Sequence, residues 1–167
     1  LTATASASNK TYDGGTTAST TLTFTGLVGS ETLGQTVGST FDNKNVGSNK
    51  TVTVNSITLA DGTGLAANYS ISAGQTITAH ISPKSLTVSG NTASNKTYDS
   101  NSSATVTVTL SGFVGSETLT YTNSSSFNNK NVGTGKTVTV DSITLADGNN
   151  GGLASNYSVT PGQTTTA

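Results

Sequence analysis

One 22-residue stretch of this chain is present twice, and that duplication limits what the chain can fold into. The sequence FDNKNVGSNKTVTVNSITLADG covers Phe41 to Gly62 and returns, with four positions changed, as FNNKNVGTGKTVTVDSITLADG from Phe127 to Gly148. A sequence that returns at a fixed distance indicates tandem copies of one structural unit. We therefore expect two similar modules rather than a single fold. The changed pairs are Asp42/Asn128, Ser48/Thr134, Asn49/Gly135 and Asn55/Asp141.

The second copy follows the first at a distance of 86 residues over most of its length. Two residues are added after Asp147, in a Gly- and Asn-rich stretch, which is where a surface loop tolerates insertion. We place the boundary after Ser82, which gives one module at residues 1–82 and a second at residues 83–167. The connection Ile81–Val88 is short and contains Pro83, so we expect a stiff hinge between the modules.

The composition excludes several classes of partner. Charged residues make up 9% of the chain, the net charge is −1, and all seven basic residues are lysines. Nucleic acid binding needs clustered cations that neutralise phosphates, so we expect no nucleic acid partner. No apolar run reaches the roughly 20 residues that span a bilayer, so we expect no membrane insertion. The chain begins at Leu1 without an initiator Met, and we expect it to be a piece of a longer protein.

Alternation of polar and apolar residues predicts strands. Thr21–Thr25 and Thr105–Leu110 both alternate with a period of two, which places the aliphatic and aromatic side chains on one face and the threonines on the other. Lys50–Val54 has the same pattern, but its parity changes after Asn55-Ser56, which predicts a bulge or a change of sheet there. We expect a further hairpin, in which Tyr69–Ile71 and Ile77–Ile81 pair around Ala73-Gly74-Gln75.

These patterns predict an all-β, mainly antiparallel fold with two tandem modules that together form an elongated rod. Each module is expected to be a small β-sandwich-like unit. The alternative is a β-grasp-like arrangement with one short helical turn, for which Gly29–Leu33 is the only candidate, with Ser30 as its cap.

Four motifs in fixed order resemble a known family in both copies, over nearly the whole chain. In the first copy these are Lys10–Gly14 (KTYDG), Gly26–Leu33 (GLVGSETL), Asn45–Gly47 (NVG) before a Thr/Val strand, and Asn68–Ile71 (NYSI). Together they resemble the YDG repeat domain, which is similar to the MBG repeats. In the second copy Ser100 stands where the first has Gly14. The resemblance implies a stalk or adhesin segment of a very large secreted bacterial surface protein of the filamentous haemagglutinin type, with no catalytic residues.

No catalytic site stands out in the sequence. His80 is the only histidine and has no counterpart in the second module, so a Ser-His-Asp triad would depend on one residue near the module boundary. We expect His80 to be a polar residue near a strand end. Paired carboxylates of the kind that cleave glycosides would have to come from positions that stay acidic in both copies. Asp13 and Asp61 precede glycines, which favours turns instead. The acidic residues are Asp13, Glu31, Asp42, Asp61, Asp99, Glu117, Asp141 and Asp147.

The loops at Asp61–Gly64 and Asp147–Asn150 are rich in oxygen atoms, but each carries a single carboxylate, whereas calcium takes six to eight oxygen ligands. We therefore expect no metal and no other cofactor. The spacing from Asp61 to Asn68-Tyr69, repeated from Asp147 to Asn156-Tyr157, is typical of a tyrosine corner, in which a Tyr hydroxyl pins a crossing loop. We expect that structural role for both tyrosines.

Three modifications or surface functions stay open. A Lys–Asn isopeptide cross-link would need Lys10 or Lys44 beside Glu31 in the core. The threonine faces of Thr21–Thr25 and Thr105–Thr109 resemble ice-binding arrays, although the solvent side of a sheet explains them equally. N-glycosylation sequons are present at Asn9, Asn49, Asn68, Asn95, Asn101, Asn123 and Asn156.

We therefore expect a structural spacer, not an enzyme: a monomeric stalk repeat of a bacterial cell-surface adhesin, exposed outside the cell, whose partners are neighbouring repeats of the same chain. The alternative is a binding module in which the loop Gly62–Ala67 or the loop Asn149–Leu153 contacts a host glycan or protein.

Overall fold

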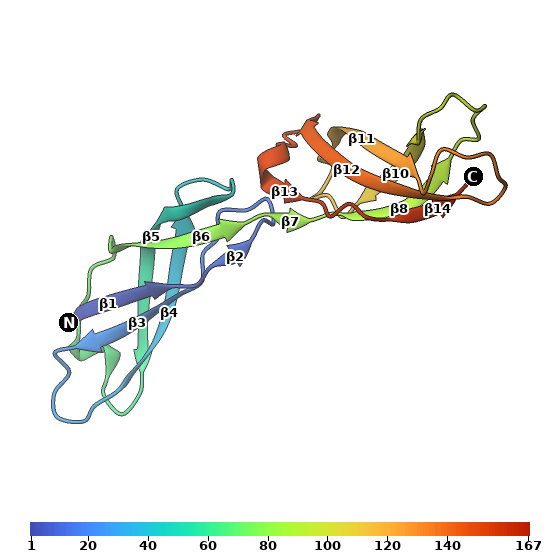
Figure 1. Cartoon of the computed structure of the whole chain (residues 1–167). Coiled ribbons are helices and arrows are strands. Elements are labelled where there is room, and N and C mark those ends of the chain that lie inside the picture. The colour runs from blue at the N-terminus through green and yellow to red at the C-terminus, as the bar shows by residue number, and fades with distance from the viewer. The chain divides into compact units, whose positions relative to one another are not determined.

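The computed structural model describes all residues from Leu1 to Ala167, and strands form most of its regular structure. The strands pair mainly antiparallel, which confirms the all-β prediction (Figure 1). The chain divides into two compact units, Leu1–Ser82 (unit 1) and Pro83–Ala167 (unit 2).

Unit 1 contains two sheets. The smaller sheet is an antiparallel pair, and the larger has four strands in the order β2-β6-β5-β4, in which only the β2–β6 pairing is parallel. A 3-10 turn, η1, follows β5. The strands are β1 (Thr2–Ala7), β2 (Lys10–Thr11), β3 (Thr20–Thr25), β4 (Leu33–Phe41), β5 (Gly47–Asp61) and β6 (Thr76–Ser82), and η1 is Ala66–Asn68.

Unit 2 repeats part of this plan, with an antiparallel β8–β10 pair and a four-stranded sheet in the order β14-β12-β11-β9. This sheet is antiparallel throughout, and its edge strand β9 pairs with β11, whereas β2 of unit 1 pairs with β6. A short parallel pairing of β7 with β13 is added. Its elements are β7 (Lys84–Ser85), β8 (Thr87–Ala93), β9 (Ser103–Ala104), β10 (Val106–Ser111), β11 (Leu119–Phe127), β12 (Thr137–Asp147), η2 (Ala154–Asn156), β13 (Tyr157–Ser158) and β14 (Thr164–Thr166).

The two sheets of unit 2 bury their valines against each other. Val106 and Val108 of β10 form one buried cluster with Val138 and Val140 of β12. The threonines between them point to solvent, because successive side chains of a strand face opposite sides of the sheet. This arrangement is sandwich-like. The β-grasp-like alternative would need a helix on the sheet, and the only helical elements are the two three-residue 3-10 turns.

The change of parity in the duplicated stretch is a bulge, which is one of the two structures that the sequence predicted there. Gly38 pairs with Ser56 and Ser39 pairs with Val54, which leaves Asn55 as the extra residue on β5. Unit 2 has the same irregularity, with Asp141 as the extra residue on β12. The bulge lets Val52 and Val54 stay fully buried while β5 continues past them.

The predicted hairpin between Tyr69–Ile71 and Ile77–Ile81 is wrong. β6 pairs with β5 and with β2, and Tyr69–Ile71 is not a strand. Two facts explain the difference: Gly74 and Gln75 hydrogen-bond to Val54 of β5, and the Tyr69 hydroxyl is engaged elsewhere.

The sequence allowed one helical turn at most at Gly29–Leu33, as part of the alternative fold, and no helical element forms there. Those residues include a single hydrogen-bonded turn, closed by the Glu31 N–H to the Val28 carbonyl at 3.1 Å, and then the start of β4. The turn at Ser100 keeps the left-handed backbone of its glycine counterpart, since φ is 70° at Ser100 and 79° at Gly14.

Within each unit the chain enters at one end and leaves at the other. The amino group of Leu1 donates to the Ser70 carbonyl at 2.8 Å, and nine residues later Lys10 lies beside Ile81, close to where β6 leaves unit 1. In unit 2 the Leu86 N–H donates to the Ser158 carbonyl at 2.8 Å, at the start of β8. Only Pro83 stands between the last strand of unit 1 and the first strand of unit 2.

Candidate functional site

In both units a tyrosine hydroxyl is hydrogen-bonded to a loop about 40 residues earlier in the chain. In unit 2 the Tyr157 hydroxyl donates to Glu117 Oε2 at 2.7 Å and accepts the N–H of Val114 at 2.9 Å. Tyr157 is 5% exposed and Glu117 is 7% exposed, so the hydrogen bond between them lies in the interior, and the one from Val114 is partly buried. Phe113 contacts the Tyr157 ring edge-on, with 5.6 Å between ring centroids. We call this arrangement the tyrosine clasp.

Unit 1 has the same clasp in a more exposed setting. The Tyr69 hydroxyl donates to Glu31 Oε2 and accepts the N–H of Val28 at 3.1 Å. The hydrogen bond to Glu31 raises the pKa of Tyr69, because the neighbouring carboxylate disfavours the phenolate. Each clasp joins a loop to the tyrosine that follows the 3-10 turn, and this loop connects β3 to β4 in unit 1 and β10 to β11 in unit 2.

The tyrosine-corner interpretation predicted a hydroxyl that pins a crossing loop, and the pinned loops are those that carry Glu31 and Glu117, not the loops that begin at Asp61 and Asp147. Asp61 Oδ1 accepts the N–H of Ala66 at 2.7 Å, and Asp147 Oδ1 accepts the N–H of Ala154 at 2.7 Å. Each aspartate accepts a hydrogen bond within its own loop, and the tyrosine hydroxyls donate to the glutamates instead. Sequence reasoning missed Glu117 as a partner of Tyr157. The available signal was that Glu and Tyr are both retained in both copies.

The residues considered for an isopeptide cross-link have separate partners. Lys10 Nζ donates to Asp13 Oδ1 and to the Gly15 carbonyl, both at 2.7 Å. Lys44 lies over the ring of Tyr12, 5.9 Å from its centroid, while Glu31 belongs to the clasp. The structure therefore does not bring Lys10 and Glu31 to a common partner.

His80 lies within β6 and has a local role. The backbone N–H of His80 donates to Asn9 Oδ1 at 2.8 Å. The ring Nδ1 accepts the backbone N–H of Asn49 at 3.1 Å, so the proton of the neutral ring is on Nε2. No three His, Asp or Glu side chains lie together as metal ligands would. No helix is long and apolar enough to cross a membrane.

The other surface candidates are distributed over both units. The threonines of β3 and β10 are exposed on the solvent side of the two-stranded sheets. Among the sequon residues, Asn156 is fully buried, so the folded chain shields it from a transferase. The loop Gly62–Ala67 is closed by the Gly62 N–H to the Gly64 carbonyl at 3.0 Å, and Leu65 on it is exposed.

Asp42 gives unit 1 an ion pair that unit 2 lacks. Its Oδ1 lies 2.8 Å from Nζ of Lys50, and the hydrogen bond from Lys50 lowers the pKa of Asp42 below 3.8. In unit 2 the counterpart of Asp42 is Asn128, and Lys136 donates to Asn129 Oδ1 at 2.5 Å. The pKa of Asp42 therefore reports on its ion pair with Lys50, which has no equivalent in unit 2.

We predict that Lys50→Met raises the pKa of Asp42 toward 3.8, as measured by a carbon-13 NMR titration of the carboxyl group. Because the folded-state pKa is lowered, the pair stabilises the fold above pH 3.8, and this contribution is lost as the pH falls through the folded-state pKa. The control is Lys136→Met, which should leave the titration of Asp42 unchanged. An unchanged Asp42 pKa in Lys50→Met would contradict the assignment.

A comparison with protein families matches the YDG domain to this chain twice, at residues 1–79 and at residues 82–167. Neither the curated proteins nor the solved structures gave a match.

Proposed function

The chain belongs to the YDG domain family and consists of two such domains in tandem, and on this premise we propose that it is a structural spacer that holds another part of a protein at a distance. The proposal extends to a very large secreted adhesin of the filamentous haemagglutinin type, exposed on a bacterial surface and related to proteins with MBG repeats. In this role the chain works without catalysis, and its partners are the neighbouring repeats.

The observation that carries the proposal is the course of the chain through each unit. The first strand of unit 1 starts beside Ser70, and the last strand leaves beside Lys10–Thr11, nine or more residues further along the extended chain. At about 3.3 Å per extended residue, each added unit would contribute roughly 30 Å. A repeat that takes the chain in at one end and releases it at the other lengthens an array with each copy.

The short connection supports the same proposal. Pro83 alone separates β6 from β7, so the units have no flexible linker to absorb extension. Proline also fixes its own φ and restricts the residue before it. The threonine-covered faces stay hydrated with few charges, and a low density of charge reduces the effect of salt on the fold.

Small-angle X-ray scattering tests the spacer. We compare this chain with an engineered chain that contains it twice in succession, and we expect the maximum dimension to grow by roughly 60 Å, that is, about 30 Å for each added unit. A matched variant with four glycines inserted after Pro83 should give a broader distance distribution, because glycine linkers behave as flexible coils.

A doubled chain that gains little in maximum dimension would overturn the spacer proposal.

A glycan array with the unmodified chain tests the alternative function, a module that binds a host glycan. Saturable, high-affinity binding that is lost on substitution of Leu65 would assign the chain to the binding modules instead.

A further inference from the structure

The loop of unit 2 that contains the two added residues is hydrogen-bonded to the loop of the tyrosine clasp. The side-chain Nδ2 of Asn150 donates to the Ser116 carbonyl at 2.9 Å. The backbone N–H of Asn149 donates to Thr118 Oγ1 at 3.1 Å, and the Thr118 N–H donates to the Asn149 carbonyl at 3.2 Å. We call residues 149–152 the inserted loop. Its three hydrogen bonds hold the chain on both sides of the glutamate of the clasp.

Asn150 is followed by Gly151, and this is the only Asn-Gly pair in the chain. In such a pair the backbone nitrogen of the glycine can attack the side-chain carbonyl carbon of the asparagine, because glycine has no Cβ to hinder the approach. Both residues are exposed and lie in a turn outside any strand, and the Gly151 N–H donates no hydrogen bond. The attacking nitrogen is therefore free, and no sheet holds the backbone around it.

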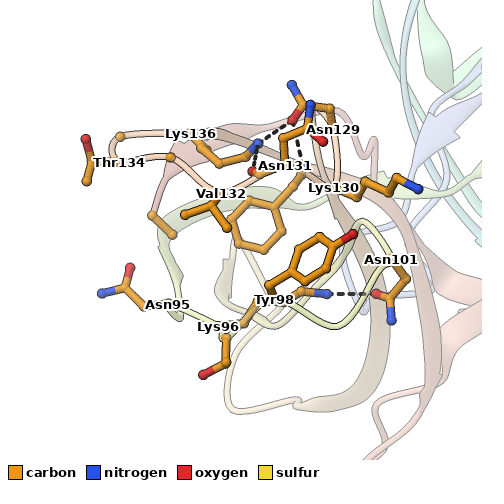
Figure 2. A pocket seen from close by; sticks show the side chains of 15 residues that line it. Asn95, Lys96, Tyr98, Asn101, Asn129, Lys130, Asn131, Val132, Thr134 and Lys136 are labelled. Atoms are coloured by element: carbon orange, nitrogen blue, oxygen red, sulfur yellow. Dashed lines mark hydrogen bonds between the residues drawn. The ribbon is translucent and has the colours of Figure 1, made fainter.

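Three other asparagines precede a small residue, serine, and the structure holds each of them: Asn55, Asn101 and Asn123. Asn55 and Asn123 lie within β5 and β11, where strand pairing keeps the backbone extended. Asn101 Oδ1 accepts hydrogen bonds from Lys96 Nζ at 2.7 Å (Figure 2) and from the Ser103 N–H at 3.0 Å. These asparagines are therefore held more firmly than an asparagine in an exposed turn whose side chain makes a single hydrogen bond.

We propose that Asn150 is a self-modification site, at which deamidation produces aspartate or isoaspartate and releases the inserted loop from the clasp. The Gly151 backbone nitrogen forms a bond to Asn150 Cγ, and its proton passes through water to the departing Nδ2, which leaves as ammonia when the Cγ–Nδ2 bond breaks. Water then opens the cyclic succinimide by adding to either carbonyl carbon, and the bond from that carbon to the ring nitrogen breaks. The reaction consumes one water molecule and releases one ammonia. It is independent of the spacer function.

The product cannot keep the hydrogen bond to Ser116. Its donor, Nδ2, is lost as ammonia, and the carboxylate that replaces the amide can only accept hydrogen bonds, as the Ser116 carbonyl also does. The modification therefore adds a negative charge and removes one of the three hydrogen bonds of the inserted loop. Unit 1 cannot change in this way, because Thr63-Gly64 stands in the corresponding loop and contains no asparagine.

Peptide mapping by mass spectrometry tests the modification. The folded chain is incubated at mildly alkaline pH in water enriched in oxygen-18, so that deamidation during the incubation adds about 3 Da, whereas deamidation during digestion in ordinary water adds about 1 Da. We expect the gain of about 3 Da to accumulate at least roughly tenfold faster at Asn150 than at Asn55 or Asn123, and isoaspartate to be among the products.

An unchanged mass at Asn150, or a gain no faster than at Asn55 and Asn123, would overturn the proposal. Aspartate without any isoaspartate would also overturn it, because direct hydrolysis of the side-chain amide gives aspartate alone.

Two variants test the release of the inserted loop. Asn150→Asp reproduces the aspartate product, and aspartate, like asparagine, tolerates the left-handed backbone that Asn150 has, with φ at 56°. The matched control, Asn149→Asp, adds the same charge at a residue that joins the clasp loop through its backbone alone. We expect amide hydrogen exchange of Thr118 to be about fivefold faster in Asn150→Asp and nearly unchanged in the control. Equal exchange rates in the two variants would show that deamidation does not release the loop, which would overturn this part of the proposal.

Discussion

Gly148→Ala is expected to destabilise unit 2 by about 3 kcal/mol, since overpacking against a fixed backbone costs roughly 1–3 kcal/mol or more. A Cβ at this position would lie 2.1 Å from the Thr118 carbonyl oxygen and 2.7 Å from the Cα of Leu119. Both are backbone atoms at the start of β11, so no side-chain rotation relieves the clash. Urea unfolding followed by NMR signals of unit 2 measures the effect as a lower midpoint.

The matched control is Gly133→Ala in the same unit. Its Cβ would meet only the flexible Lys136 side chain, at 3.5 Å, which is an ordinary contact. The midpoint should change little. Gly62→Ala tests the same contact in unit 1, where a Cβ would lie 2.3 Å from the Thr32 carbonyl oxygen. Equal unfolding midpoints for Gly148→Ala and Gly133→Ala would show that the close approach at β11 is not a constraint.

Tyr157→Phe is expected to destabilise unit 2 by about 2 kcal/mol, because a buried carboxylate and a partly buried N–H each lose a partner. The groups concerned are Glu117 and the Val114 N–H, which the hydroxyl holds at 2.7 and 2.9 Å. The aromatic ring and its contact with Phe113 remain in this variant. The loss therefore isolates the hydroxyl, and urea unfolding of unit 2 measures it.

Tyr69→Phe is the internal comparison, since it removes the same hydroxyl from the more exposed clasp of unit 1. Water can replace a lost hydrogen bond to Glu31 more readily than one to Glu117, so the effect should be clearly smaller. A loss in Tyr69→Phe that equals or exceeds the loss in Tyr157→Phe would contradict the view that burial gives the clasp its strength.

Local pattern was enough to predict the strands that contain Thr21–Thr25, Lys50–Val54 and Thr105–Leu110, and to locate the irregularity at Asn55-Ser56. The alternation through Lys50–Val54 and its change of parity at Asn55 involve only neighbouring residues. With a period of two, only one face of the strand can carry both Val52 and Val54, so that face must be the buried one. The duplication was enough to predict two similar units, because nearly identical sequences bury the same side chains in the same way.

The clasp and the pairing of β6 could not be predicted in this way. Glu117 and Tyr157 are 40 residues apart, and the residues next to each of them give no indication that the two side chains are in contact. The segment Tyr69–Ile71 has strand-forming residues, but its tyrosine is held by a loop some 40 residues earlier, so tertiary contacts override local propensity. The role of Ile81 was hidden for the same reason, since its neighbours come from both Gly47 and Lys10.

The parallel pairing of β2 with β6 has a mechanical consequence for unit 1. If the chain is pulled at Leu1 and at Ser82 in opposite directions, β2 and β6 are drawn past each other along their length. The hydrogen bonds that link Lys10–Thr11 and Tyr12 to Ile81–Ser82 are then loaded together in shear, instead of being peeled apart one after another. Rupture under tension thus requires several bonds to fail at once, which raises the force that the unit withstands before it yields.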